Sequence, residues 1–170
     1  MGLQPRIDPL ITELVNGAAH DEAEVRDAMV NALGAVVTSG GANMGPPSRE
    51  AVANIVSQTL EEPGKEAFNA GVARILAGIV LHSMPQAEPM LSTVLETKAS
   101  QFSSLCLLTC LENAPQQLYN IVPPSKVVGR ILKNVISDAP GVARPAREAR
   151  DLLKKTAPWS EDEDIQARLA

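Results

Sequence analysis

Residues 8–38 read DPLITELVNGAAHDEAEVRDAMVNALGAVVT, and this stretch predicts two short helices joined by a turn. Pro9 suits the first turn of a helix, where a missing N–H loses no partner, and Asp8 is expected to cap that helix. Asn16-Gly17 is a stop signal. Apolar residues recur at helical spacing and line one face of this first helix: Leu10, Ile11, Leu14, Val15 and Ala18.

The second helix is expected to run from Glu22 to Thr38. Glu22 and Glu24 lie near its start, where the helix dipole favours acidic side chains. Its apolar stripe consists of Val25, Ala28, Met29, Ala32, Leu33, Val36 and Val37. Residues 8–38 therefore predict one amphipathic helix pair.

The same pattern recurs along the chain. First helices are expected to begin near residues 8, 48, 86 and 124, and second helices near 22, 64, 99 and 140. Steps of about 40 residues are typical of HEAT and armadillo solenoids. We therefore expect an all-α fold, a right-handed α-solenoid of about four HEAT-like helix pairs. A single globular all-α domain is the alternative that the pattern leaves open.

Some boundaries carry specific expectations. Ser48 is expected to cap the third helix after a loop at 39–47, and residues 115–123 are expected to be a connector. Pro145 either kinks the last helix or marks its true start. The predicted domains are a repeat module at residues 1–157 and an acidic tail at 158–170, where Ser160 and Glu163 would cap a short helix unless it frays.

Composition agrees with a helical core and limits the classes of function. Of 170 residues, 45% are apolar but only 2% are aromatic, so the core must be mainly aliphatic. No apolar run approaches the roughly 20 residues of a membrane span. Two cysteines do not make a disulfide framework, so a reducing, cytoplasmic setting is expected. The net charge of −5 argues against general nucleic-acid binding, DNA included.

No catalytic motif is present in the sequence, and we expect no enzyme activity, cofactor or metal. His20 and His82 are expected to be partly exposed residues near helix ends. Cys106 and Cys110 share a helical face, which is half of a zinc site, but the chain has no second pair. Buried structural thiols are the favoured interpretation.

Basic residues concentrate near the C-terminal end. Residues 121–156 carry eight basic and three acidic side chains, although the whole chain is acidic. In the last predicted helix, the candidate partner-binding residues are Arg144, Arg147, Arg150 and Lys154. Such a stripe suits ribosomal RNA phosphates or an acidic protein surface, and an ordinary solvated face is the alternative. This basic stripe contains no aromatic residue that could stack on bases, which argues against sequence-specific RNA binding.

Two aromatic residues lie outside the helical stripes, and one of them has two interpretations. Tyr119 and Trp159 are candidate anchors for a partner protein. For Trp159, folding back over the open end of the last pair is favoured, because an uncovered apolar end lowers solubility.

Residues at the first pair resemble a known family. These are the run from Arg6 to Gly17, the segment Val25-Arg26-Asp27-Ala28-Met29, the pair Ala32-Leu33 and the segment Gly41-Ala42-Asn43. Together they resemble the C-terminal HEAT-repeat region of the Gcn-one family, giant translational activators of the amino-acid starvation response. The likeness is specific over residues 6 to about 55, and beyond residue 60 it is only the same order of helices.

The resemblance implies a non-catalytic scaffold that is a small piece of a much longer chain or a divergent relative. Members of this family sit on translating ribosomes and bind the RWD domain of the kinase that phosphorylates the alpha subunit of initiation factor two. The resemblance does not assign the family's critical arginine to a particular arginine of this sequence, so no site residue is carried over, and Arg26 is expected to be structural. An importin-like or phosphatase-scaffold-like adaptor remains the alternative protein-binding function.

Overall fold

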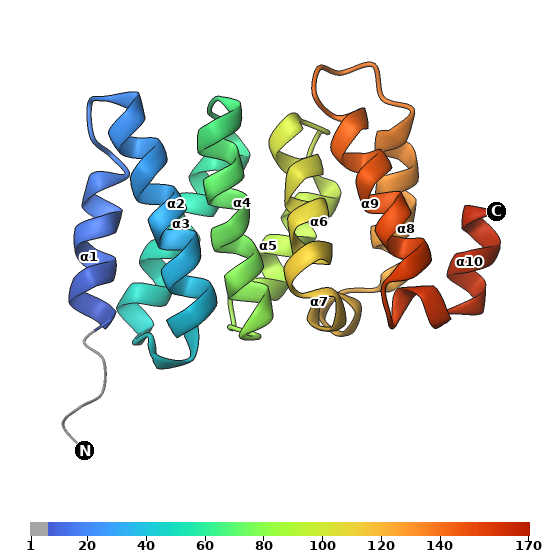
Figure 1. Cartoon of the computed structure of the whole chain (residues 1–170), viewed down its shortest axis with the longest axis horizontal. Coiled ribbons are helices and arrows are strands. Elements are labelled where there is room, and N and C mark those ends of the chain that lie inside the picture. The colour runs from blue at the N-terminus through green and yellow to red at the C-terminus, as the bar shows by residue number, and fades with distance from the viewer. Residues whose placement is uncertain (1–6) are drawn as a thin grey trace.

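The chain is described by a computed structural model that covers residues 7–170. Figure 1 shows its helices succeeding one another along the long axis, with α1 and α10 at opposite ends. The α-helices are α1 Ile7–Gly17, α2 Ala23–Gly40, α3 Pro46–Glu61, α4 Glu66–Leu81, α5 Ala87–Glu96, α6 Gln101–Asn113, α7 Pro115–Ile121, α8 Pro124–Val135, α9 Ala143–Lys155 and α10 Glu163–Leu169. Two 3₁₀ turns, η1 at Gly41–Asn43 and η2 at Trp159–Glu161, complete the elements.

Eight of these helices form four pairs stacked in two rows. The first row consists of α1, α3, α5 and α8, and the second row consists of α2, α4, α6 and α9. Each helix packs against its pair partner and against its neighbours in the same row. Residues 7–170 contain helices and turns but no strand. The expected all-α solenoid of four helix pairs is therefore confirmed.

Helix α7 was not expected from the sequence, where residues 115–123 were assigned to a connector. Pro115 occupies the first turn of this seven-residue helix, and Leu118 is fully buried. The segment is too short to show a helical period in the sequence. That Leu118 is a core residue becomes evident only in the structure, where α7 packs against α4, α6 and α8. It inserts an extra turn of helix between the third and fourth pairs.

Asp8 does not cap its own helix, which corrects the expectation from sequence. It lies inside α1, and its Oδ1 accepts hydrogen bonds from the Gly45 N–H at 3.0 Å and the Ser48 hydroxyl at 2.6 Å. Gly45, not Ser48, is the N-cap of α3. The hydroxyl and the amide hold the pKa of Asp8 below its ordinary value. Asp8 therefore links the first pair to the second.

The expected loop at 39–47 is also much shorter than predicted. Helix α2 continues to Gly40, η1 follows directly, and α3 begins at Pro46. Gly41 lies against the His82 and Met84 side chains, so this segment is packed onto the second pair. In a sequence, clustered glycines predict a loop, but here they allow other parts of the chain to pack closely against the backbone. The sequence alone does not distinguish these two uses of glycine.

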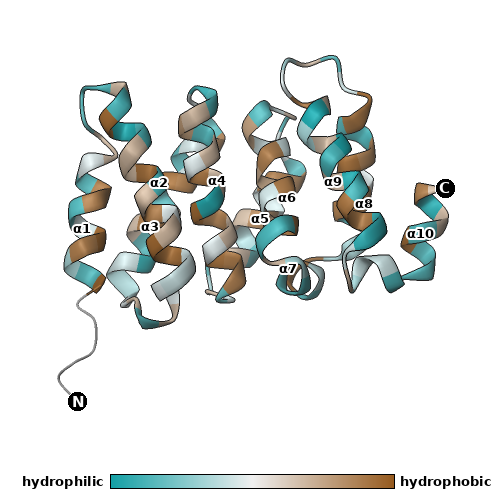
Figure 2. Ribbon diagram, viewed as in Figure 1, coloured by the Kyte–Doolittle hydropathy of each residue, from teal (hydrophilic) through white to brown (hydrophobic). Residues whose placement is uncertain are grey.

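The buried apolar residues form one core that is continuous along the array, and Figure 2 shows hydrophobic residues on helices along its whole length. In the second row, α4 approaches α2 closely because Gly71 and Gly78 face it. A Cβ added at Gly78 would lie 2.7 Å from Val37 Cγ1 and 3.0 Å from the Thr38 backbone nitrogen. The missing side chains at Gly71 and Gly78 therefore permit the close approach of these two helices. No helix within residues 7–170 has both the length and the apolar character needed to cross a bilayer.

Leu33→Ala tests the assigned core. Leu33 lies on α2 and has no exposed surface, so the substitution should lower the free energy of unfolding by about 2–5 kcal/mol. The measurement is urea denaturation followed by circular dichroism. Ile136→Ala is the control, since Ile136 is 80% exposed, and it should change stability by at most about 0.5 kcal/mol. Equal effects of the two substitutions would show that the core is misassigned.

Trp159 folds back onto the protein and is buried against α7. Its side chain has no exposed surface, and its indole N–H donates to the Pro115 carbonyl oxygen at 2.9 Å. The Tyr119 ring meets it edge to face, with the centroids 5.2 Å apart. Trp159 thus connects the tail to α7, and neither aromatic ring is a free anchor for a partner.

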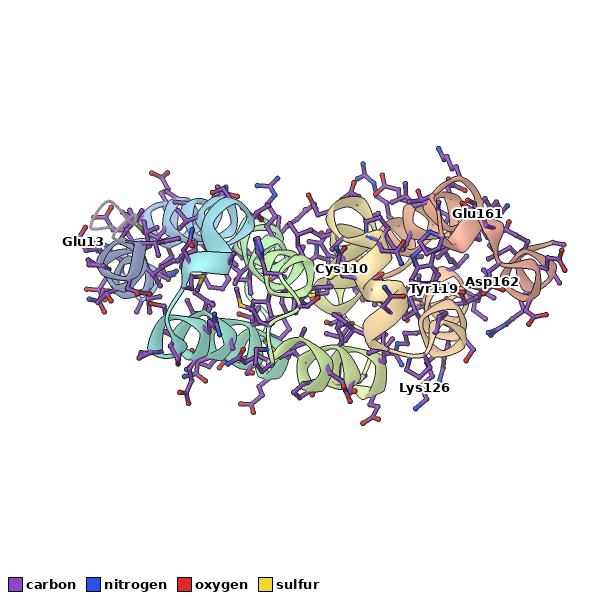
Figure 3. The ribbon with its side chains drawn as sticks, turned by 90° about the horizontal axis from the view of Figure 1, so that it is seen from below. Glu13, Cys110, Tyr119, Lys126, Glu161 and Asp162 are labelled. Carbon is purple, nitrogen blue, oxygen red and sulfur yellow. The ribbon has the colours of Figure 1, made fainter. Side chains whose placement is uncertain are left out.

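The acidic tail forms a helix with a different cap from the one expected. Asp162, not Ser160, is the N-cap of α10, and its Oδ1 accepts from the Ile165 N–H at 3.1 Å. Its Oδ2 accepts from the Tyr119 hydroxyl at 2.8 Å, and the two residues lie together in Figure 3. These bonds lower the pKa of Asp162, the Tyr119 hydroxyl contributing most. The same contact raises the pKa of Tyr119.

The contact between Asp162 at the start of α10 and Tyr119 on α7 should depend on pH. Because the pKa of Asp162 is lowered on folding, its stabilising effect is present above the ordinary value of 3.8 and is lost as pH falls through the lowered value. Trp159 is the chain's one tryptophan, so its fluorescence reports the opening directly. Tyr119→Phe should move the midpoint of the acid transition to higher pH, whereas Glu161→Gln should not. An identical midpoint in wild type and Tyr119→Phe would contradict the assignment.

Candidate binding surface

Helix α9 is held firmly against the array, so the side chains on its outer face have defined positions. The Ser104 hydroxyl on α6 donates to the Val142 carbonyl oxygen at 2.7 Å, just before the helix begins. Ala146, Ala149 and Leu153 are buried on its inner face. Pro145 lies in the first turn of α9. Of the two expectations for this residue, it therefore marks the start of the helix and does not kink it.

The four basic residues predicted from sequence are not equivalent in the structure. Arg144, Arg147 and Lys154 are exposed on the outer side of α9. Arg150 is half-buried, and its Nε has no hydrogen-bond partner. The structure therefore brings three of the four onto a solvent-facing helix surface and places the fourth at its edge.

Acidic residues interrupt this basic surface. Glu148 and Asp151 are exposed on α9, and Glu148 lies close enough to Glu112 on α6 to affect it. The pKa of Glu112 is raised, mainly by burial and then by Glu148, while Arg74 on α4 opposes the shift. The surface around α9 thus carries both acidic and basic side chains, and basic residues outnumber acidic ones on the helix itself.

A hollow of about 300 Å³ lies beside the start of α9. Arg144 and Glu148 line it from α9, Glu66 lines it from α4, and Leu105 lines it from α6. It contains opposite charges and an apolar wall, which are features of a protein contact and do not form a catalytic constellation.

The remaining sequence candidates are structural. Cys106 and Cys110 are fully buried, as expected; burial raises the pKa of Cys110 to about 12 and that of Cys106 as well. Thiols of this kind are inert as nucleophiles. His20 is exposed and its Nδ1 accepts from the Glu22 N–H, and half-buried His82 contacts the Thr38 carbonyl oxygen through Nε2. Among residues 7–170, no three His, Cys, Asp or Glu side chains gather in a way that would hold a metal.

Arg26 has the structural role expected of it. Its Nη1 donates to the carbonyl oxygens of His20 and Asp21, at 2.7 and 2.9 Å. These bonds fix the turn between α1 and α2. Arg26 is accordingly part of the framework of the first pair.

Sequence reasoning did not single out a second set of basic residues, which lies on α8. Lys126, Arg130 and Lys133 are spaced at i, i+4 and i+7, so they share one face of the helix. That spacing was visible in the sequence. Their importance was not, because it depends on the groove that α8 forms with α5.

The comparisons with known proteins agree with this architecture. A family model described as "Stalled ribosome sensor GCN1-like, HEAT repeats" matches residues 8–155. The chain is 30% identical over 142 residues to "eIF-2-alpha kinase activator GCN1" from Saccharomyces cerevisiae (strain ATCC 204508 / S288c). That match covers 79% of this chain and only 5% of the yeast protein. No solved structure matches the chain significantly. The match over nearly all of the four helix pairs shows that this chain belongs to the GCN1-like family of HEAT-repeat regions.

Proposed function

We propose that this chain is a non-catalytic docking module of a GCN1-like activator, and that α9 contributes to binding the RWD domain of the starvation-responsive initiation-factor-two alpha kinase. The proposal is supported by family membership and by the yeast relative, whose name describes a kinase activator. The observation that carries it is the exposure of Arg144, Arg147 and Lys154 on a helix with a rigid backbone. Arg150 adds a fourth cation at the edge of the same surface.

A rigid basic helix face suits recognition of an acidic domain. Since Ala146, Ala149 and Leu153 fix α9 by their burial, little backbone order is lost when a partner binds. Exposed charges mainly accelerate association and select the partner, so the interaction should weaken with salt. Glu148 and Asp151 within the same face favour a mixed-charge protein surface over a polyphosphate.

Family membership favours this function over an importin-like or phosphatase-scaffold-like adaptor. Association with the ribosome and a cytoplasmic setting belong to the same proposal, because the family model is described as a stalled ribosome sensor. Both are proposed for the longer activator of which such a module forms a part.

Charge reversal on α9 tests the proposal. Arg144→Glu, Arg147→Glu and Lys154→Glu combined should weaken binding to the purified RWD domain of the kinase at least about tenfold, equivalent to about 1.4 kcal/mol. The affinity of the variant should also depend less steeply on salt than that of the wild type. Isothermal titration calorimetry at two salt concentrations measures both effects. Arg150 is kept in this variant, because its buried Nε makes its reversal a test of folding as well.

The matched control reverses basic residues on the other row. Lys126→Glu with Lys133→Glu changes the net charge in the same direction but lies on α8, so it should leave RWD affinity within about twofold of wild type. Circular dichroism verifies that both variants are folded. Absence of RWD binding by the folded wild type would refute the proposal, and equal losses in both variants would refute the role of α9.

A further inference from the structure

A groove runs along the first row between α5 and α8. It consists of two adjoining hollows of about 310 and 540 Å³, both lined by Glu96, Arg130 and Lys133. The groove lies between the third and fourth pairs, so it is internal to the array. It is separate from α9, which belongs to the second row.

The groove lies in the row of helices that packs more loosely. In the second row, α6 and α9 pack directly on each other, and the Ser104 hydroxyl donates to the Val142 carbonyl oxygen between them. In the first row, the chain passes through α7 before α8 begins, and Val122 and Pro123 from this passage form one wall of the first hollow. A hollow also lies between α3 and α5, so the looser packing of the whole first row leaves room for such spaces.

Buried polar atoms in the groove lack partners. Asn134 is only 1% exposed and lines the larger hollow, yet neither its Nδ2 nor its Oδ1 has a hydrogen-bond partner. Arg130 donates from Nη2 to the Thr97 carbonyl oxygen at 2.7 Å, which leaves its buried Nε unpaired. Buried polar groups are nearly always paired, and each orphan destabilises a protein by roughly 1–3 kcal/mol. The Asn134 amide stands out among them, because both its donor and its acceptor are without a partner and the residue lines the groove.

The chemistry of the lining narrows the class of ligand. A primary amide offers one acceptor and two donors in a plane, which complement the N–H and C=O groups of a peptide backbone. The basic residues Lys98, Lys126, Arg130 and Lys133 line the two hollows, against one acid, Glu96. Lys126 projects away from the ribbon of α8 in Figure 3. An acidic ligand therefore complements the groove.

The groove also has apolar surface for a side chain. Leu95 and Val122 line the smaller hollow, and Ile136 lines the larger one with 80% of its side chain exposed. An exposed isoleucine beside unpaired buried polar atoms is typical of a binding surface without its partner. The groove has aliphatic lining residues but no aromatic residue on which bases could stack, so a peptide suits it better than a nucleic acid.

We propose that the α5–α8 groove binds an acidic, extended peptide segment of a partner protein, with at least one apolar residue. Its carboxylates pair with Lys126, Lys133 and Lys98. Its backbone bonds to the Asn134 amide, and its apolar side chain packs on Ile136. This site is independent of the proposed RWD-domain surface on α9.

Selection from a displayed library of random 12-residue peptides against the folded 170-residue chain tests the proposal. Selected peptides should be enriched in Asp and Glu together with aliphatic residues. Fluorescence anisotropy of a labelled selected peptide then measures affinity. Lys126→Glu with Lys133→Glu should weaken binding at least tenfold, and Ile136→Ser at least threefold.

Asn134→Leu separates binding from folding. Leucine has the same branching at Cγ as asparagine but no polar atoms, so this substitution should weaken peptide binding at least fivefold. Because leucine is the larger side chain, the thermal midpoint of the variant is measured alongside to verify that the fold is kept. The combined α9 reversal of Arg144, Arg147 and Lys154 is the matched control and should leave the peptide affinity unchanged.

Three outcomes would overturn the proposal. They are selected peptides without acidic enrichment, acidic peptides whose affinity survives both the α8 reversal and Asn134→Leu, and displacement of the peptide by polyuridylic acid at concentrations below those of the unlabelled peptide. The last would assign the groove to a nucleic acid. None of them bears on RWD binding, which is measured with a different ligand and a different variant.

Discussion

Close packing of the second-row helices is the constraint on which the rest of the structure depends. Gly71 and Gly78 let α4 approach α2 until a single added methyl group would collide with backbone. Dense packing of this kind transmits position from one pair to the next, because few voids remain to absorb a displacement. Asp8 adds a polar link in the first row by bonding to the start of α3. The array is therefore a rigid support with its outer faces left free.

The two rows differ at the third and fourth pairs, and the difference has consequences for function. The second row remains closed there and presents α9 as a fixed helix with exposed basic residues. The first row packs more loosely there, and the groove lined by Asn134 lies between α5 and α8. One module thus displays two surfaces of different chemistry, a mixed-charge helix face and a basic groove with apolar lining. Ligands that use surfaces separated in this way do not compete for the same residues.

Much of the fold could be predicted from the sequence because its signals are local. The helical period, the prolines at first turns and the step of about 40 residues identified four pairs and their order. Errors arose where one residue type has two uses. Asp8 looked like a cap for its own helix but binds the next pair. Glycines at 40 and 41 looked like a loop but lie in packed helical segments. The short α7 had no period to reveal it.

The candidate surfaces show the same division. The sequence by itself determined the amphipathic helices, the aliphatic core and the concentration of basic residues near the C-terminal end, since these follow from the order of side chains along the chain. Tertiary structure alone decided that Arg150 is half-buried while Arg147 is exposed, and that Asn134 is enclosed without a partner. Burial and pairing depend on which helices meet across the rows, and that information is distributed over residues far apart in the sequence.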